Sequence, residues 1–273
     1  MNFKIVGKPI SHSLSPTIHN YWFKKYSIKA NYSHLEVDEK ELPGVIEDMK
    51  NNIIKGINVT LPYKQKIIPF LNKIINEAKE TNSVNTVYLN EDNEIVGENT
   101  DVYGVQAAYL KKMVSENIKR QSALVIGAGG VAPSIVLALL KSNISKISIT
   151  NRTHEKSLFV KKKFPSLEVI EWSNITKLSN NFDIIINATS LGLKNEQDFD
   201  FEIKNYKRSM KFIDTIYNPL ETNMVKHFKK NGIKTYSGLE MLIYQAQKSF
   251  YLWTKINPEI DDVLVNLLME KLK

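Results

Sequence analysis

The sequence predicts an α/β protein built of two domains. Short apolar segments typical of strands alternate with segments of helical periodicity along most of the 273 residues. A glycine-rich turn at 127–130 joins one of these strand segments to a helix segment. The length is sufficient for two medium-sized domains, each able to bury its own core.

The first third of the chain is predicted to alternate strands and helices. Ser15 followed by Pro16 marks the start of a helix, because serine is a favoured N-cap and proline is tolerated at the first helical position. Residues 91–93 are expected to connect two strands as a hairpin. Strands separated by helices indicate parallel β-α units. The expected strands are 3–6, 32–37, 56–59, 87–89 and 94–97, and the expected helices are 15–26, 39–51 and 67–81.

A helix at 100–112 is expected to lead into a second block with the alternation of a Rossmann fold. Two C-terminal helices, at 238–255 and 258–273, have no strand between them and are expected to return to the first domain. We therefore assign residues 1–101 and 238–273 to one domain and residues 102–237 to the other. The expected strands of the second block are 123–126, 146–150, 168–171, 184–187 and 211–214, with helices at 131–141 and 154–164.

The composition excludes several kinds of site. The chain has no cysteine, so disulfides, thiolate metal sites and cysteine nucleophiles are ruled out. His12 and His19 lack the spacing of metal ligands, so no metal site is expected. The chain carries 37 Lys and Arg against 29 Asp and Glu, a net charge of +8. Its lysine clusters lack interleaved aromatic residues, so no nucleic-acid partner is expected.

No membrane span and no secretory signal are expected. The uncharged stretch 122–140 is nearly long enough to cross a bilayer, but glycines and a proline divide it into a strand, a turn and a helix. The first ten residues carry two lysines, and a glycine and a proline interrupt them before an apolar region forms. We therefore expect a cytoplasmic protein.

Residues 127–132, with the sequence GAGGVA, match the dinucleotide-binding pattern G-x-G-x-x-G/A. The first glycine permits a tight turn, the second lets a pyrophosphate approach the backbone, and the helix N-terminus supplies free N–H groups. Such turns also occur for packing alone, but the strand before this one and the helix after it favour nucleotide binding. The candidate residues are Gly127, Ala128, Gly129, Gly130 and Val131.

The residues after the next strand predict NADP rather than NAD. NAD-binding folds usually place an acidic side chain there, which binds the ribose 2′-hydroxyl. This chain instead has Arg152 and, shortly after it, Lys156, whose charges suit a 2′-phosphate. An arginine after a strand is also common on protein surfaces. The candidate residues are Asn151, Arg152, Thr153 and Lys156.

Eight short motifs, in order along residues 7–253, resemble the shikimate dehydrogenase family. The resemblance implies an oxidoreductase that reversibly reduces 3-dehydroshikimate to shikimate with NADPH, on the route to chorismate and the aromatic amino acids. The substrate would be a small hydroxylated ring that carries a carboxylate. The motifs are SHSLSP (11–16), GINVTLPYK (56–64), SVNT (83–86), NTDVYG (99–104), GAGGVA (127–132), NRT (151–153), NATS (187–190) and GLEML (238–242).

The resemblance implies that Lys64 and Asp101 are the catalytic pair. A lysine beside a carboxylate can stay protonated, polarise the C3 carbonyl and deliver a proton to its oxygen. Asp101 would orient the ammonium group and bind a ring hydroxyl. From the residues alone, a lysine–aspartate pair is more often a surface salt bridge that contributes little.

Further residues match family positions that bind substrate or cofactor. Ser13 and Ser15 offer hydroxyls to the carboxylate at a helix N-terminus, although Ser15 also suits the N-cap. Asn58 and Asn85 match positions that bind ring hydroxyls, although either is also a suitable turn residue. The implied substrate contacts are Ser13, Ser15, Asn58, Thr60, Asn85, Tyr217 and Gln245, and the implied additional cofactor contacts are Thr215 and Gly238.

Three alternatives are weighed against this function. One is a quinate/shikimate dehydrogenase that accepts NAD. Lys156 favours this alternative, because many family members carry arginine at that position and a lysine would weaken the preference for NADP. A second is a nucleotide-binding regulatory protein of the same fold without turnover. The third and least favoured is a nucleic-acid binder, whose signature is salt-dependent binding to DNA. The enzyme is expected to be a monomer or a homodimer.

Overall fold

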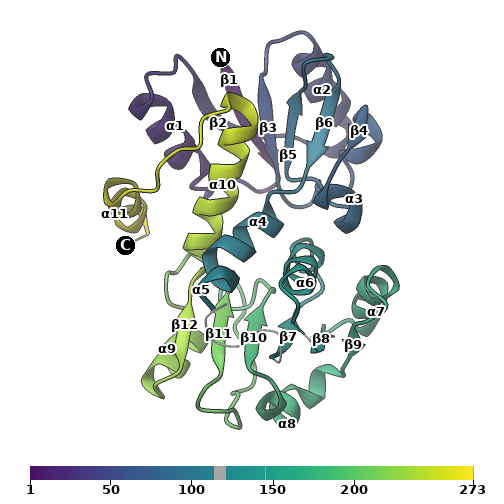
Figure 1. Cartoon of the computed structure of the whole chain (residues 1–273), viewed down its shortest axis with the longest axis vertical. Coiled ribbons are helices and arrows are strands. Elements are labelled where there is room, and N and C mark those ends of the chain that lie inside the picture. The colour runs from purple at the N-terminus through teal and green to yellow at the C-terminus, as the bar shows by residue number, and fades with distance from the viewer. Residues whose placement is uncertain (114–120, 145, 273) are drawn as a thin grey trace. The chain divides into compact units, whose positions relative to one another are not determined.

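The computed structural model describes residues 1–113, 121–144 and 146–272, so the last residue of the predicted C-terminal helix lies outside the described part (Figure 1). The chain divides into two compact units. The first contains Met1–Gly104 and Leu242–Lys271, and the second contains Val105–Met241. Each unit has one six-stranded sheet flanked by helices. The predicted two-domain α/β fold is confirmed.

The first unit has a mixed sheet with the strand order β2-β1-β3-β5-β6-β4. The strands β2, β1 and β3 are parallel, as expected for β-α units, whereas β5 is antiparallel to both β3 and β6. The β5–β6 pair is the hairpin that the sequence predicts. The strands are β1 (Asn2–Gly7), β2 (Asn31–Glu36), β3 (Gly56–Val59), β4 (Lys73–Ile74), β5 (Thr86–Leu89) and β6 (Ile95–Glu98).

Helices cover both faces of this sheet. The helix α2 (Leu42–Lys50) buries Leu42, Val45, Ile46 and Met49, the i, i+3, i+4, i+7 pattern of an amphipathic helix. These side chains join one apolar cluster with Val6 of β1 and with Ile57 and Val59 of β3. On the other face, the rings of Phe3 and Trp253 lie 5.0 Å apart, which brings α10 (Gly238–Thr254) onto β1. Helices α1 (Ser15–Lys25), α3 (Glu77–Thr81) and α11 (Asp262–Lys271) complete the unit.

The predicted helix at 67–81 is wrong. Ile68–Phe70 form a single 3₁₀ turn, β4 follows, and only α3 is helical. Pro69 has no backbone N–H to continue a helix, and Asn76 adopts a left-handed backbone angle, φ +47°, which ends any regular helix there. The apolar residues that suggest a helix, such as Ile67 and Leu71, instead pack into the core cluster of this unit from irregular backbone, and Ile74 lies in β4, which pairs with β6 in parallel. Sheet pairing has overridden the local pattern.

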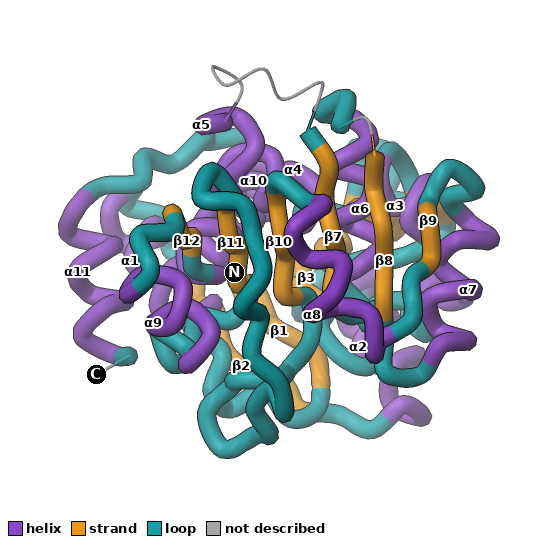
Figure 2. Tube along the Cα trace, turned by 90° about the horizontal axis from the view of Figure 1, so that it is seen from below, coloured by secondary structure: helices purple, strands orange, loops and turns teal. Residues whose placement is uncertain are grey.

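The second unit has a fully parallel sheet with the order β12-β11-β10-β7-β8-β9, and Figure 2 shows β11, β10, β7 and β8 side by side. This is the predicted Rossmann-type alternation. The sequence does not predict the short strand β12, which pairs with β11, or the helix α9 before it. The strands are β7 (Ser122–Ile126), β8 (Lys146–Thr150), β9 (Glu168–Val169), β10 (Ile184–Asn187), β11 (Lys211–Asp214) and β12 (Lys234–Tyr236).

Apolar side chains of β7, β10 and β11 pack against α9 in one core cluster of this unit. The expected helix at 100–112 is present as α4 (Asp101–Val105), a π-helical turn (Gln106–Leu110) and α5 (Lys111–Met113). No helix in the described part of the chain is long and apolar enough to cross a membrane. The remaining helices are α6 (Ala132–Lys141), α7 (His154–Lys163), α8 (Ile175–Leu178) and α9 (Asn223–Lys230).

Candidate functional site

Lys64 lies on a short segment that is fixed at several points after β3. Its carbonyl accepts a hydrogen bond from the backbone N–H of Val84 at 2.8 Å. The preceding residue, Tyr63, is buried and donates its hydroxyl hydrogen bond to the carbonyl of Val37 at 2.8 Å. The lysine side chain therefore leaves a backbone of defined position, as a proton donor requires.

Lys64 and Asp101 form a close and largely buried ion pair. The Lys64 Nζ lies 2.5 Å from the Asp101 Oδ2, and the two side chains are only 14% and 7% exposed. The pair Lys8–Asp38, by contrast, is 49% and 56% exposed. An exposed pair of that kind contributes little to stability. The burial of Lys64 and Asp101 distinguishes them from the ordinary surface salt bridge that the residues alone left open.

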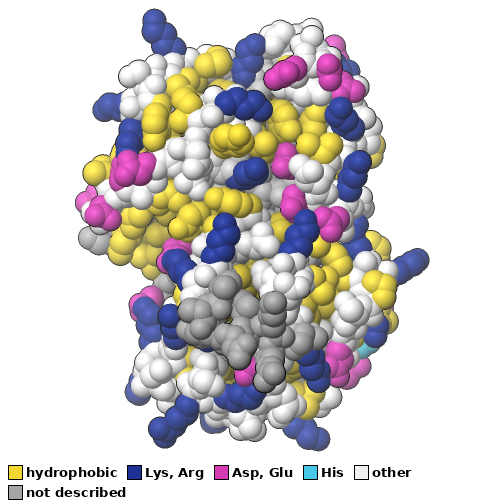
Figure 3. All heavy atoms as spheres, in the orientation of Figure 1, with side chains coloured by type: hydrophobic (Ala, Val, Ile, Leu, Met, Phe, Trp, Pro, Cys, Tyr) yellow, Lys and Arg dark blue, Asp and Glu magenta, His cyan; other side chains and the backbone are white. Residues whose placement is uncertain are grey.

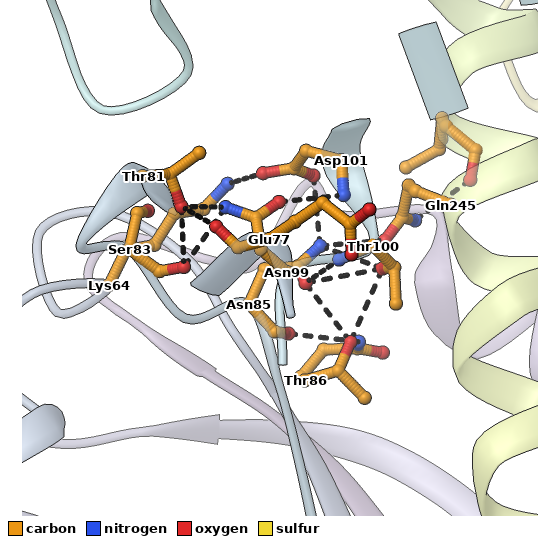
Figure 4. Close-up of polar contacts among 12 residues, drawn as sticks. Lys64, Glu77, Thr81, Ser83, Asn85, Thr86, Asn99, Thr100, Asp101 and Gln245 are labelled. Atoms are coloured by element: carbon orange, nitrogen blue, oxygen red, sulfur yellow. Dashed lines mark hydrogen bonds and ion pairs between the residues drawn. The ribbon is translucent and has the colours of Figure 1, made fainter. Parts of the chain in front are cut away.

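Asn85 connects this ion pair to its surroundings (Figure 4). Its Nδ2 donates to the Asp101 Oδ1 at 2.9 Å, so each oxygen of that carboxylate has its own donor. The Asn85 Oδ1 accepts the backbone N–H of Thr100 at 2.7 Å. The amide oxygen of Gln245, from α10, lies 3.4 Å from the same Nδ2. Four of the predicted residues, Lys64, Asp101, Asn85 and Gln245, therefore lie in one cluster.

Asn58 has its amide fully engaged within the protein. Its Oδ1 accepts the hydroxyl of Tyr32 at 2.8 Å, and its Nδ2 lies 3.1 Å from the carbonyl of Asn85 and 3.0 Å from the Ser249 hydroxyl. The side chain is 5% exposed. Asn58 thus holds the backbone of Asn85 through this hydrogen bond. Its direct contact with a ring hydroxyl of the substrate stays a prediction.

At the start of α1, Ser13 has the role in satisfying the helix that the sequence suggests for Ser15. The predicted N-cap, Ser15, is the first helical residue, and Leu14 occupies the N-cap without a side-chain bond. The Ser13 Oγ accepts the backbone N–H of Ser15 at 3.3 Å and lies 3.2 Å from its Oγ. Ser13, not Ser15, therefore satisfies a free N–H at this helix start, because a helix leaves its first N–H groups without backbone partners.

Thr60 and Tyr217 each follow a strand, in different units. Thr60 comes directly after β3, where its N–H donates to the carbonyl of Val6 at 2.9 Å. Tyr217 lies in the loop after β11. Both side chains are partly exposed. Their expected contact with a substrate carboxylate stays a prediction.

The glycine-rich turn has the geometry of a dinucleotide loop. Gly127 has a φ of +110°, and a Cβ there would come within 2.8 Å of the Ala188 backbone. At Gly129 a Cβ would meet no atom within 4 Å, so the space beside this backbone is open. The turn leads directly into α6, and the exposed backbone of Gly129 lies before its first residues. An open, uncrowded backbone at a helix N-terminus fits the diphosphate of a dinucleotide.

The segment after β8 is bound to this turn. The Asn151 Oδ1 accepts the backbone N–H of Ala128 at 3.0 Å, and its Nδ2 donates to the Thr153 carbonyl at 2.9 Å. Arg152 and Lys156 are exposed. Asn151 therefore orients the backbone of both loops. Arg152 borders a cavity of about 360 Å³ whose other lining residues are Trp172, Leu191, Gln197, Asp198 and Asp200.

Thr215 and Gly238 are in contact with each other. A Cβ on Gly238 would lie 2.1 Å from the Thr215 carbonyl oxygen, so only glycine fits there. The Thr215 N–H and hydroxyl both donate to the carbonyl of Asn187, at 3.1 and 2.9 Å. The motif around Asn187 is one of those that resemble the family, but the sequence predicts no site residue in it. The signal that was available is the polar residue at the end of a fully buried strand.

No group of three or more histidine, aspartate or glutamate residues in the described part of the chain could bind a metal ion. His19 is fully buried, and its ring stacks on that of Tyr32 with centroids 4.5 Å apart. Burial lowers the pKa of His19 to about 3, so the ring is uncharged at neutral pH.

Three family models match the chain. The shikimate dehydrogenase substrate binding domain matches residues 5–87, the shikimate/quinate 5-dehydrogenase matches residues 109–234, and the shikimate 5′-dehydrogenase C-terminal domain matches residues 238–264.

Relatives of similar length match along almost the whole chain. The shikimate dehydrogenase (NADP⁺) of Pelagibacter ubique strain HTCC1062 is 46% identical over 266 residues, which cover 97% of this chain and 98% of that protein. A crystal structure of a shikimate dehydrogenase in complex with NADP⁺ has a TM-score of 0.90 at 33% identity and covers 100% of this chain and 96% of its own.

The shikimate 5-dehydrogenase of Thermus thermophilus, in complex with NADP(H) and shikimate, has a TM-score of 0.86 at 26% identity, with full coverage of both chains. The sequence motifs, the fold and these similarities agree. The chain belongs to the shikimate dehydrogenase family.

Proposed function

We propose that this protein is an NADP-dependent oxidoreductase that reversibly reduces 3-dehydroshikimate to shikimate, with Lys64 as the general acid and base. The observation that carries the proposal is the buried Lys64–Asp101 pair within a polar cluster, in a chain of this family. The product feeds the synthesis of chorismate and the aromatic amino acids. The first unit would bind the substrate, and the second would bind NADP.

Lys64 would move the proton of the reaction. The ammonium group can donate a hydrogen bond to the C3 carbonyl oxygen and transfer a proton to it as the carbonyl is reduced. When bound, NADPH supplies the hydride to C3. The Asp101 Oδ2, 2.5 Å from the Lys64 Nζ, accepts a hydrogen bond from the ammonium group and restrains its direction. In the reverse reaction, the neutral lysine would accept the proton of the C3 hydroxyl.

Asn85 and Gln245 would position the ring. Both amides border the ion pair, and both are less than a tenth exposed. Asp101 would bind a ring hydroxyl beside Lys64, while Asn58 supports Asn85 through its carbonyl. Ser13, Ser15, Thr60 and Tyr217 are proposed to bind the carboxylate, because their hydroxyls can donate hydrogen bonds to an anion.

The second unit offers sites for both ends of a dinucleotide. The backbone of residues Gly127–Val131 at the start of α6 suits the diphosphate, and Thr215 and Gly238 are proposed to contact the nicotinamide half. Arg152 and Lys156 carry the charge for a 2′-phosphate. The cavity beside Arg152 is lined by Trp172 and Leu191, which offer apolar contact to a flat ring, and by the polar side chains of Gln197, Asp198 and Asp200.

A spectrophotometric assay tests the reaction by following the absorbance of NADPH at about 340 nm. The enzyme should form NADPH from shikimate and NADP⁺. Replacing shikimate by quinate, and NADP⁺ by NAD⁺, separates this function from an NAD-accepting quinate/shikimate dehydrogenase. A regulatory protein without turnover would bind NADP⁺ but form no NADPH.

The surface charge bears on the third alternative, a nucleic-acid binder. Lys and Arg side chains lie scattered over the face seen in Figure 3, without a continuous basic stripe there.

The cofactor preference predicts the effect of Arg152→Ala. The loss of charged hydrogen bonds to the 2′-phosphate should cost about 1.5–3 kcal/mol, which raises the KM for NADP⁺ roughly 10- to 150-fold. Use of NAD⁺ should change little. Arg208→Ala removes another exposed guanidinium that does not border the cavity, and it should leave both constants unchanged. Equal losses with both cofactors would show that Arg152 does not bind the 2′-phosphate.

We propose further that the enzyme works in the cytoplasm as a monomer or a homodimer. Sedimentation of the purified protein, with and without NADP⁺, measures the oligomeric state. A stable tetramer would contradict this part of the proposal.

A further inference from the structure

The carboxyl ends of three neighbouring strands meet at one edge of the sheet in the second unit. Strand β10 lies between β7 and β11, and the three are parallel. From β7 the chain continues to β8 on one side, whereas β10 and β11 lie on the other, so the strand order reverses between β7 and β10. Ligands of open α/β sheets bind at such a reversal. The loops after β7, β10 and β11 are therefore the ones that a nucleotide contacts.

Asp214 ends β11 and has no solvent exposure. Its Oδ1 accepts the Asn187 Nδ2 at 3.0 Å and the backbone N–H of Ile216 at 3.1 Å. Its Oδ2 accepts the hydroxyl of Thr222 at 2.7 Å. One oxygen thus connects the end of β10 to the loop after β11, and the other connects to the N-cap of α9.

Asn187 is also hydrogen-bonded to the loop after β10. Its Oδ1 accepts both the backbone N–H and the hydroxyl of Thr189, at 3.0 and 2.7 Å. Its Nδ2 also donates to the carbonyl of Leu191 at 3.2 Å. The amide can make these bonds only in one orientation, and the Asp214 Oδ1 selects that orientation by accepting an N–H.

The loop after β10 in turn packs closely against the glycine-rich turn and leaves no room for a side chain on Gly127. The Ala188 carbonyl carbon and oxygen lie only 2.8 Å from the position of a Cβ on Gly127. On the other side, the Asn187 carbonyl accepts both donors of Thr215, whose own carbonyl leaves no room for a side chain on Gly238. A displacement of Asn187 would therefore move all three loops at this edge.

The partners of Asp214 do not neutralise its charge, since they are an amide, a hydroxyl and a backbone N–H. Burial raises the pKa of Asp214 to about 6, although its hydrogen bonds oppose the rise and the nearby Asp198 adds to it. At pH 7 to 8 the protein therefore carries a buried carboxylate that lowers its own stability.

We propose that Asp214 is a positioning residue for the cofactor: through Asn187 and the N–H of Ile216, its carboxylate fixes the loops after β10 and β11 in the arrangement that binds NADP. The inference rests on the proposed function in that it takes the dinucleotide to bind at this edge. Asp214 itself touches neither cofactor nor substrate in this role.

Direct calorimetric titration with NADP⁺, without shikimate, tests the inference independently of turnover. Asp214→Ala removes the acceptor and should raise the Kd for NADP⁺ about 10-fold or more, because the Asn187 amide is released. Asp214→Asn keeps one oxygen for Asn187 and Ile216, so the Kd should return to within about threefold of the parent. In the assay, the KM for NADP⁺ should follow the Kd, while the KM for shikimate stays within about twofold.

Thr222→Val is the matched control, because it removes the bond from Asp214 to the N-cap of α9 and leaves the loop contacts intact. It should lower the Tm without changing the Kd for NADP⁺. If Asp214→Ala does not fold, Asn187→Ala should raise the Kd in its place. A folded Asp214→Ala or Asn187→Ala protein with the parental Kd would overturn the inference. A parent that binds NADP⁺ but forms no NADPH from shikimate would contradict the proposed function alone.

Discussion

Two buried carboxylates, Asp101 in the first unit and Asp214 in the second, lie at or just after the end of a strand and accept an N–H from an asparagine amide. They differ in the partner of the other oxygen. The Asp101 Oδ2 faces the Lys64 ammonium at 2.5 Å, whereas the Asp214 Oδ2 faces the neutral Thr222 hydroxyl at 2.7 Å. A cation is present where a proton is proposed to move, and neutral donors surround the carboxylate that fixes loops.

The largest effect is expected from the cation of this comparison. Lys64→Ala should lower kcat by roughly 10²–10⁴, the usual contribution of a positioned general acid or base. NADP⁺ affinity should be nearly unchanged, because the second unit is proposed to bind the cofactor. Lys64→Arg should not restore kcat, because a guanidinium does not release its proton near neutral pH. A kcat within a few-fold of the parent would assign the proton to Asp101 or to a bound water.

Because Asp214, unlike Asp101, has no cationic partner among its hydrogen-bond donors, we predict that it makes the stability of the protein depend on pH. The pKa of this group is raised by burial from 3.8 to about 6. The folded protein therefore binds a proton more readily than the unfolded chain, and this group adds stability as the pH falls from 6 toward 4. The full effect is about 3 kcal/mol, at about 1.4 kcal/mol per pH unit.

Asp214→Asn removes this titration. Denaturant unfolding of parent and variant should show that their difference in unfolding free energy changes in favour of the parent as the pH is lowered from 8 to 4.5. Other carboxylates act in the opposite sense: the pKa of Asp261 is lowered to about 2, chiefly by hydrogen bonds from Lys25 and Tyr21 that outweigh burial. Because both proteins share them, the difference isolates Asp214. A constant difference across this range would mean that Asp214 titrates normally.

Asn85 offers an intermediate test on the first side of the comparison. Asn85→Ala leaves the Asp101 Oδ1 and the Thr100 N–H without their partner, at a cost of about 2–3 kcal/mol. Both the Tm and the affinity for shikimate should fall, and the Kd for NADP⁺ should not change. If the KM for shikimate were unaffected while the Tm fell, Asn85 would be structural only.

The smallest effect is expected at Ser13, whose oxygen is shared between a proposed ligand and the protein. Ser13→Ala should cost about 1.5 kcal/mol of shikimate binding and so raise the KM for shikimate roughly 10-fold. It should also lower the Tm slightly, because the Ser15 N–H loses its acceptor. Ser11→Ala, a change at an exposed neighbour, is the control. A lower Tm with an unchanged KM would assign Ser13 to the helix start alone.

Much of the fold could be predicted from the sequence because its signals are local. The glycine-rich turn, the buried strands around it and the hairpin at 91–93 are each specified by a few adjacent residues, and the structure contains them all. The segment 67–81 could not be predicted in this way. Its apolar spacing fits a helix, and only the available edge of β6 turns part of it into a strand.

The sequence by itself determined which residues are present in the family's motifs, and therefore which side chains are candidates for catalysis. Only the tertiary structure decided how these side chains are paired. It buries Lys64 against Asp101, engages the Asn58 amide within the protein, and gives Ser13 the role expected of Ser15. It also brings Asp214 to Asn187, 27 residues earlier in the chain. Such contacts depend on strand order and burial, which act between distant segments and leave no local pattern in the sequence.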